Sequence, residues 1–409
     1  MDTPNQAAKD AVLAYARTQI QGNRIPTIVY LGRDVDISKE KEAFVLDAPG
    51  GHRRYTWKLV YEDHELPDFS IERSFSRMKA QAADPDTKVV MAFSGGGLKV
   101  FGHITIVKFL NSLGVYPHLD EIWGTSGGAI AGYWYSCNLV PEEVQAYGFA
   151  LYNRLFSLKI SPSKFDVIKN LFINYCLPEK LRPSGFRGFI NCTKSLTHFI
   201  DSVRNGAPIQ KPFYCIAFNI QKLKTEVLTS EAINPNLYGG KIHNVNPLEA
   251  TVASSSVPIL FAPKTIRRDG LDIQYVDGGL EENIPLKSIY EKWLADKKAG
   301  IEKRKKLLII SSGLENENRL ELLGGHSMND REMIRISLSL LFQAIENSHR
   351  ALLRQDPDVT LWDFQIPLSH YPVFDVKFIP QFYKSGYQEV ASKALEIESH
   401  LETEMRKAA

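Results

Sequence analysis

From about residue 88 onward, short apolar runs alternate with segments whose apolar residues recur at helical spacing. Lys88 to Phe93 has the length and composition of a strand buried on both faces, and a helical pattern follows at about 102–113. Strands that alternate with helices favour an α/β fold with a mostly parallel central sheet and helices on both faces. The other predicted strands are Glu121–Trp123, Phe213–Asn219, Thr225–Leu228, Ile273–Val276 and Leu307–Ser311.

Two long helices are predicted near the C-terminus, because apolar residues recur there on one side of a helix. Both belong to a core domain expected at 87–409. The first helix would place Ile334, Leu338, Leu341 and Ile345 on one face, and the second would do so with Val390, Ala394, Ile397, Leu401 and Met405.

Residues 1–86 are expected to form an N-terminal extension with a regulatory or partner-binding role. Helical spacing is present at about 6–21, and a strand is predicted at 27–31. The sequence APGG at 48–51 is a turn signal, which predicts a hairpin between Phe44–Leu46 and Tyr55–Tyr61. Residues 81–86 have the composition of a linker to the core.

The composition disfavours several classes of function and of structural site. A formal net charge of +2 over 409 residues gives no global attraction to nucleic acid. The four cysteines lie far apart with no paired spacing, which disfavours a zinc site and a disulfide framework and suits a reducing compartment. We expect no metal and no cofactor. The N-terminus lacks the apolar stretch of a secretory signal, so a cytoplasmic or peripheral membrane location is expected.

The uncharged stretch from Ile122 to Val140 has the length of a membrane span. It contains four glycines, two serines, a threonine and an asparagine, so its apolar character is weak. A buried strand, a turn and a helix explain this stretch better than a transmembrane helix does.

The sequence GTSGG at 124–128 matches the pattern G-x-S-x-G. That pattern serves a sharp turn from strand to helix, which lifts a serine hydroxyl out of the backbone at a helix N-terminus. Alone it is weak, but a short strand precedes it and a helix of small residues follows. These neighbours favour Ser126 as a nucleophile over an ordinary glycine-rich turn.

The sequence SGGGLK at 94–99 directly follows a buried strand. Successive glycine amides can converge on one point, as a backbone oxyanion hole requires, and Lys99 would add positive potential at its rim. A phosphate-binding loop is the competing interpretation. The dinucleotide pattern fails at Val100, and the P-loop pattern fails at His103 and Ile104.

The sequence YVDGGL at 275–280 places Asp277 at the end of a short strand and before two glycines. Such an aspartate can point at a neighbouring hydroxyl, although an Asx-turn would explain the same residues. If Asp277 acts as a base toward a serine, we expect burial to raise its pKa above the usual value near 3.9.

These three elements in this order resemble the patatin-like phospholipases. The resemblance covers roughly residues 88–312 and extends to ASSSVP at 253–258, FAP at 261–263 and NIP at 283–285. The chain departs from the family at Val100, where glycine is usual, which leaves the path of the loop open. The resemblance implies a patatin-like three-layer fold and a nucleophile elbow at Ser126, with Asp277 as its base. It also implies an oxyanion hole at Gly95, Gly96 and Gly97, with Lys99, Gly124, Gly128, Gly278 and Gly279 in support.

The activity so implied is that of a lipid acyl hydrolase, of phospholipase A or lysophospholipase type. It would cleave carboxylic esters of membrane lipids through a Ser–Asp dyad and an acyl-enzyme. One alternative is a Ser–His–Asp esterase, for which His326 in a glycine-rich loop is the candidate, ahead of His349, His370 and His400. Another is a catalytically silent lipid-binding or partner-binding module. His103 is expected to be a packed structural residue.

A long insertion is expected at about 141–212, rich in aromatic residues. Between 151 and 211 it carries ten basic residues and three acids, a local charge of +7. Basic and aromatic residues interleaved in this way suit docking on an anionic membrane surface, and a packed helical cap with a solvated basic face explains them equally well.

Overall fold

The computed structural model describes residues 27–33, 43–47, 54–60, 75–152, 193–204, 206–258, 260–314, 330–368, 371 and 375–408. The helix expected at 6–21 and most of the insertion at 141–212 lie outside the described residues, as do His326 and His370.

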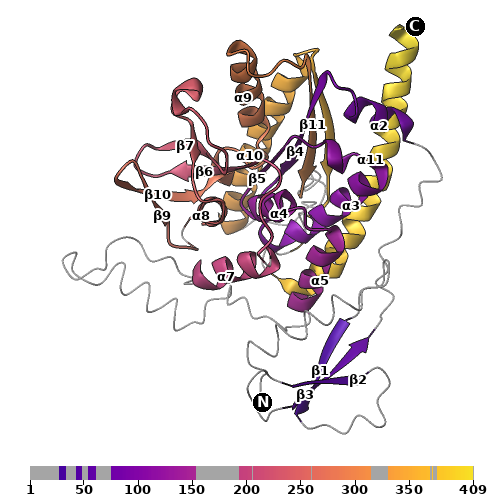
Figure 1. The fold of residues 1–409 in the computed structure, drawn as a ribbon, viewed down its shortest axis with the longest axis vertical. Helices are drawn as coiled ribbons and strands as arrows, with labels where there is room; N and C mark the ends of the chain where they lie inside the picture. The colour runs from indigo at the N-terminus through magenta and orange to yellow at the C-terminus, as the bar shows by residue number, and fades with distance from the viewer. Residues whose placement is uncertain are drawn as a thin grey trace.

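The described part of the core forms a nine-stranded, mostly parallel sheet, which confirms the α/β class expected from the sequence (Figure 1). Its main path runs β12-β11-β4-β5-β6-β10-β9, and β7 and β8 extend from the other edge of β6. The first five strands of this path are parallel to one another. The strands are β4 (Thr87–Phe93), β5 (Glu121–Thr125), β6 (Phe213–Asn219), β7 (Lys224–Thr229), β8 (Ile242–Asn244), β9 (Lys264–Arg268), β10 (Leu271–Asp277), β11 (Lys306–Gly313) and β12 (Val359–Gln365).

Helices cover both faces of this sheet, and alternate residues of β4 face opposite layers. Met91 and Phe93 belong to the larger apolar core, whereas Val90 and Ala92 belong to a second core. The larger core packs α2 (Ser76–Ala82), α3 (His103–Leu113), α4 (Gly127–Ser136), α5 (Pro141–Tyr152), α7 (Thr193–Arg204), α8 (Pro247–Ser254) and α11 (Ile379–Ala408). The second core packs α9 (Leu286–Lys298) and α10 (Asp330–Arg354).

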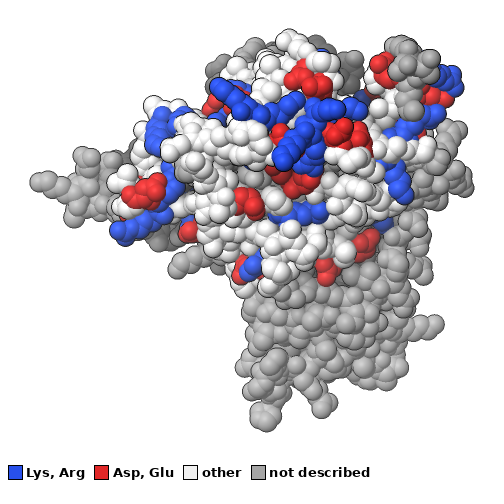
Figure 2. All heavy atoms as spheres, turned by 45° about the horizontal axis from the view of Figure 1, so that its top comes forward, with Lys and Arg blue, Asp and Glu red and all other residues white. Residues whose placement is uncertain are grey.

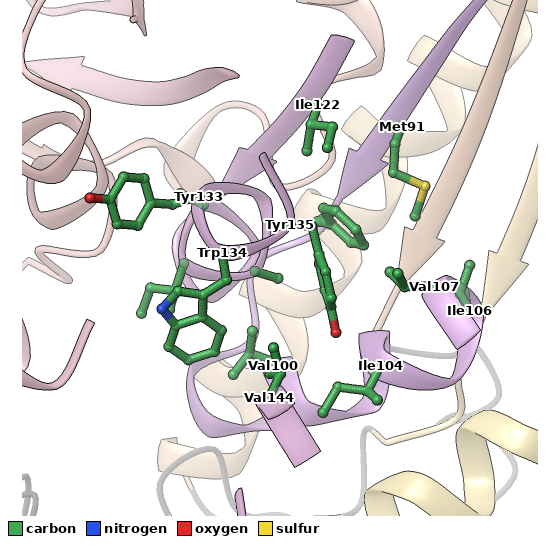
Figure 3. Close-up of a cluster of buried hydrophobic side chains, with 14 of the residues drawn as sticks. Met91, Val100, Ile104, Ile106, Val107, Ile122, Tyr133, Trp134, Tyr135 and Val144 are labelled. Atoms are coloured by element: carbon green, nitrogen blue, oxygen red, sulfur yellow. The ribbon is translucent and has the colours of Figure 1, made fainter. Parts of the chain in front are cut away.

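Aromatic side chains fill the layer between the sheet and α4. Figure 3 shows Met91 and Ile122 projecting from neighbouring strands toward Tyr135 of α4. Trp134 of the same helix is fully buried and donates its ring N–H to the carbonyl of Ile200 in α7, at 3.0 Å. Residues 122–140 are thus the buried strand, turn and helix expected from their composition. No helix in the described part of the chain is long and apolar enough to cross a membrane.

The structure corrects several expectations about elements. Strands β8, β9 and β12 were not predicted. The linker expected at 81–86 begins as the end of α2, whose Met78 and Ala82 are buried in the larger core. On α10, Leu341 was expected on the apolar face, but its side chain is 55% exposed.

In the N-terminal region, three strands form a separate antiparallel sheet in the order β1-β3-β2. They are β1 (Thr27–Arg33), β2 (Ala43–Asp47) and β3 (Arg54–Val60). The pairing of β2 with β3 confirms the hairpin predicted around residues 48–51, and β1 adds a third strand along the other edge of β3.

Two strands meet end to end along one edge of β6. Strand β5 runs parallel to β6 and ends with Thr125 opposite Ile216. Strand β10 runs antiparallel to β6 and ends with Asp277 opposite Ala217, the next residue along. The other edge of β6 is occupied by β7. The residue that follows β5 and the last residue of β10 are thereby brought together, although they are far apart in the sequence.

Candidate functional site

Ser126 lies in the sharp turn between β5 and α4, with backbone angles of φ 55° and ψ −125°. A non-glycine residue with positive φ is uncommon and costs conformational energy, so it persists only where its surroundings hold it. The turn also needs close backbone contact. A Cβ on Gly128 would lie 2.3 Å from the carbonyl oxygen of Phe93, and a Cβ on Gly124 would lie 2.2 Å from that of Gly128. These contacts explain why both positions are glycine.

The C-terminal end of α8 holds the backbone of this turn on both sides. The Ser254 hydroxyl accepts a hydrogen bond from the N–H of Ser126 at 3.0 Å, and the Ser255 hydroxyl donates to its carbonyl at 2.9 Å. The next residue, Ser256, accepts from the N–H of Asp277 at 2.9 Å through its carbonyl. Three consecutive serines therefore fix both Ser126 and Asp277.

The buried Asp277 carboxyl group lies next to the Ser126 side chain, which favours its ionised form. The carboxyl group accepts from the N–H of Gly279 at 2.8 Å, at the start of the short helix η6 (Gly278–Leu280). Burial raises the pKa of Asp277 to about 6, and Ser126 and the bond from Gly279 oppose part of that rise. The direction and the cause agree with the expectation from the sequence.

The glycine loop after β4 lies beside Ser126 but does not offer all three amides. The motif suggests Gly95 as an oxyanion donor. In the structure its N–H instead donates to the carbonyl of Asn283 at 3.1 Å, so it is not available to an oxyanion. The N–H groups of Gly96 and Gly97 donate to no group in the described part of the chain. Lys99 is 1% exposed and so is not at a solvent-facing rim.

His103 is a buried structural histidine that anchors the start of this loop. Its Nε2–H donates to the carbonyl of Ser94 at 3.0 Å, and its Nδ1 accepts from the Ser312 hydroxyl at 2.6 Å. Burial lowers the pKa of His103 to about 3, so the ring is neutral at physiological pH. Both ring nitrogens are engaged, as expected for a packed residue.

None of the histidines in the described ranges bonds to Ser126 or Asp277. His349 lies on α10, and burial lowers its pKa below the ordinary value; its charged neighbours include Glu281 and residues of α9. His400 is exposed on α11. No group of three or more His, Cys, Asp or Glu side chains among the described residues could hold a metal ion.

The segment after η6, at residues 282–283, links the nucleophile turn, the glycine loop and α10 through hydrogen bonds. The sequence did not predict this role. The carbonyl of Glu282 accepts from the Thr125 hydroxyl at 3.0 Å, next to the nucleophile position. The carbonyl of Asn283 accepts from Gly95, and its side-chain N–H donates to Glu346 of α10 at 3.2 Å. The sequence NIP at 283–285 was part of the family resemblance, but it gave no sign that the backbone of Asn283 contacts the glycine loop.

Comparison with known proteins identifies a family with a similar sequence. Residues 91–290 match the family model described as patatin-like phospholipase. A search of curated proteins by sequence finds no match. Among solved structures, VipD from Legionella pneumophila is similar at 12% identity and a TM-score of 0.38, with 76% of this chain and 67% of that chain covered. Human GIVD cytosolic phospholipase A2 is similar at 11% identity and a TM-score of 0.38, with 88% and 72% covered.

Proposed function

Because this chain belongs to the patatin-like phospholipase family through residues 91–290, we propose that it cleaves acyl esters of membrane lipids with Ser126 and Asp277. The observation that carries the proposal is the buried Asp277 carboxyl group next to the Ser126 side chain, with two glycine amides of the neighbouring loop available as donors. A nucleophile, a base and an oxyanion site are the three parts that acyl transfer requires.

In the proposed reaction, Ser126 Oγ attacks the acyl carbonyl while its proton passes to Asp277. The N–H groups of Gly96 and Gly97 donate to the oxyanion that forms. Asp277 then returns the proton to the leaving alcohol or lysolipid, and an acyl ester remains on Ser126. Asp277 next removes a proton from a water molecule that attacks this ester. Collapse of the second oxyanion releases the fatty acid, and Asp277 returns its proton to Ser126 Oγ to restore the hydroxyl.

The raised pKa of Asp277 supports its role as a general base. A carboxylate with an ordinary pKa is a weak base toward an alcohol, whereas a pKa of about 6 lies close to physiological pH. At neutral pH most molecules would still hold Asp277 in the ionised form that catalysis needs. The Ser126 hydroxyl next to this carboxylate is placed to pass its proton to Asp277.

A Ser–His–Asp esterase and a silent binding module are the rival proposals. The triad finds no support at His349 or His400, neither of which bonds to Asp277. Replacing His326 with alanine should therefore leave turnover within about twofold of wild type, whereas a triad would lose about 10⁴-fold or more. A silent module would have no need to hold a serine hydroxyl in a strained turn against a buried carboxylate.

A fluorophosphonate probe, which reacts with activated serines, tests the proposal. We expect the wild-type protein and the matched variant Ser112→Ala to be labelled, and Ser126→Ala to be unlabelled. Asp277→Asn should be labelled at least about a hundredfold more slowly, because the probe then meets a serine without its base. Release of fatty acid from phosphatidylcholine should follow the same order. Labelling of Ser126→Ala at the wild-type rate would show that another residue is the nucleophile.

A further inference from the structure

Two leucines at hairpin tips are the most exposed large apolar side chains in the described part of the chain. Leu223, in the turn between β6 and β7, is 76% exposed, and Leu271, at the start of β10, is 67% exposed. An isolated exposed leucine is ordinary on a protein surface, but two at adjoining tips are not.

The two tips are joined to each other. The side chain of Gln221 accepts from the N–H of Gln274 at 2.9 Å and donates to the carbonyl of Asp272 at 3.4 Å. The N–H of Ile220 also donates to the carbonyl of Gln274, at 3.0 Å. The turn after β6 therefore lies against the first half of β10, and both leucines project at the same end of the sheet.

Folding alone does not explain a leucine at 223. Its backbone φ is 49°, in the left-handed region where glycine or asparagine is favoured. The position thus combines an unfavourable backbone conformation with exposure of an apolar side chain. By contrast, the turn between β9 and β10 uses Asp269 and Gly270 at φ 54° and 78°, a pair that suits a tight hairpin.

The tips stand at the end of the sheet that holds the dyad. Strand β6 runs from Ala217, opposite Asp277, directly to the turn that bears Leu223. Along β10, Leu271 lies six residues from Asp277, about 20 Å at the rise of an extended strand. Leu280, three residues beyond Asp277, is also partly exposed, at 44%. Exposed leucines therefore occur both at the tips and next to the dyad.

Basic side chains surround the two leucines. Segments 221–224 and 267–272 together carry four basic residues and two acids, a local charge of +2. Lys222, Lys224 and Arg267 are exposed among them, whereas Arg268 is nearly buried. Lys222 and Arg268 both pair with the buried Glu226, at 3.3 and 3.0 Å, so Lys224 and Arg267 are the main cations available to a lipid surface. Exposed leucines flanked by lysine and arginine match the chemistry of an anionic lipid surface, where the apolar groups enter the interface and the cations stay with the headgroups.

A second basic group lies at the opposite end of the sheet, around the end of α9 and the start of β11, and it is a weaker candidate. Figure 2 shows Lys and Arg there interspersed with Asp and Glu. Arg304 pairs with Asp120 at 2.8 Å, and Lys306 pairs with Asp84 at 3.4 Å. These charges are largely compensated, and a membrane bound there would face the end of the sheet remote from the dyad.

We propose that the tips at Leu223 and Leu271 dock on an anionic bilayer and turn the end of the sheet that bears the dyad toward its lipid substrate. This inference rests on the proposed function, because it gives the lipid hydrolase the surface through which it reaches its substrate. Docking at the tips leaves the dyad about one strand length from the bilayer, so a lipid must be lifted partly out of its leaflet to reach Ser126.

The test compares binding to phosphatidylcholine vesicles with and without phosphatidylserine by co-sedimentation. The test variant is Leu223→Asn with Leu271→Thr, and the matched control is Ile301→Ser, which removes a side chain that is 62% exposed at the opposite end of the sheet. We expect the double variant to bind anionic vesicles at least about tenfold more weakly and the control to bind like the parent. Asparagine tolerates the left-handed conformation and threonine suits a strand, so both should fold, which the thermal midpoint checks.

All proteins in this test carry Ser126→Ala, so binding is measured without hydrolysis and is independent of whether the catalytic proposal holds. Unchanged binding by the double variant, or an equal loss in Ile301→Ser, would overturn the docking surface. Equal binding to vesicles without phosphatidylserine would overturn the role of the basic residues.

Discussion

Replacing Asp277 with asparagine should abolish turnover and yet stabilise the protein at neutral pH. In the folded protein, burial raises the pKa of Asp277 from an ordinary value of 3.8 to about 6. Between about pH 4 and pH 6 the folded state therefore binds more protons than the unfolded chain, and stability falls as pH rises through this window. A shift of this size corresponds to about 3 kcal/mol, at about 1.4 kcal/mol for each tenfold change in the protonation equilibrium.

Asparagine removes this penalty while it keeps the shape of the side chain. Its carbonyl oxygen can still accept from the N–H of Gly279, and its N–H₂ group can donate to the Ser126 hydroxyl, which rotates to accept. The gain in unfolding free energy over wild type should therefore be close to zero near pH 4 and rise to about 3 kcal/mol above about pH 7.

Urea denaturation across this pH range measures the effect. Tryptophan fluorescence suits the assay, because Trp123, Trp134, Trp293 and Trp362 are fully buried. The control is Asp269→Asn, which replaces a carboxylate whose side chain is 86% exposed and should show no such pH dependence. A variant at Asp277 that is less stable than wild type near pH 7.5, or a difference that does not change with pH, would refute the reasoning.

Two further predictions concern activity. The value of kcat/KM should fall about tenfold for each pH unit below about 6, as Asp277 takes up its proton, and a profile that stays flat down to about pH 4 would contradict this base. Ser254→Ala should lower kcat about tenfold or more with little change in KM, because the Ser126 amide loses its acceptor. Ser256→Ala removes only a hydroxyl that donates to the carbonyl of Val252 in α8, and this variant should keep the wild-type kcat. An equal loss of kcat in both variants would argue for general destabilisation.

The strands of the parallel core were predictable because they are buried on both faces and so appear as continuous apolar runs. Strands β9 and β12 were missed because their residues are only partly buried and the apolar signal is diluted. The pair Asp269-Gly270 was a usable hairpin signal that could have revealed β9. Leu341 was misplaced because helical spacing identifies a face but not the neighbour that covers it.

At the site, the sequence identified the residues that local motifs define, and it could not supply the contacts between them. Ser126 and Asp277 each stand next to glycines that mark a turn in the sequence, and folding brings the two side chains together. The loss of Gly95 as a donor depends on a carbonyl of Asn283, which comes from a distant segment. The roles of Ser254 and Ser255 were missed for the same reason, because no local sequence pattern shows that their hydroxyls bond to the backbone of Ser126.

Because β5 and β10 both pair with one edge of β6, that strand sets the distance between the two halves of the site. Thr125 and Asp277 are set against consecutive rungs, Ile216 and Ala217, so their spacing is independent of the length of chain between them. Evolution could therefore lengthen, shorten or exchange the intervening segments and leave the chemistry in place. Deleting a single residue of β6 at this point would instead turn one partner to the opposite face of the sheet.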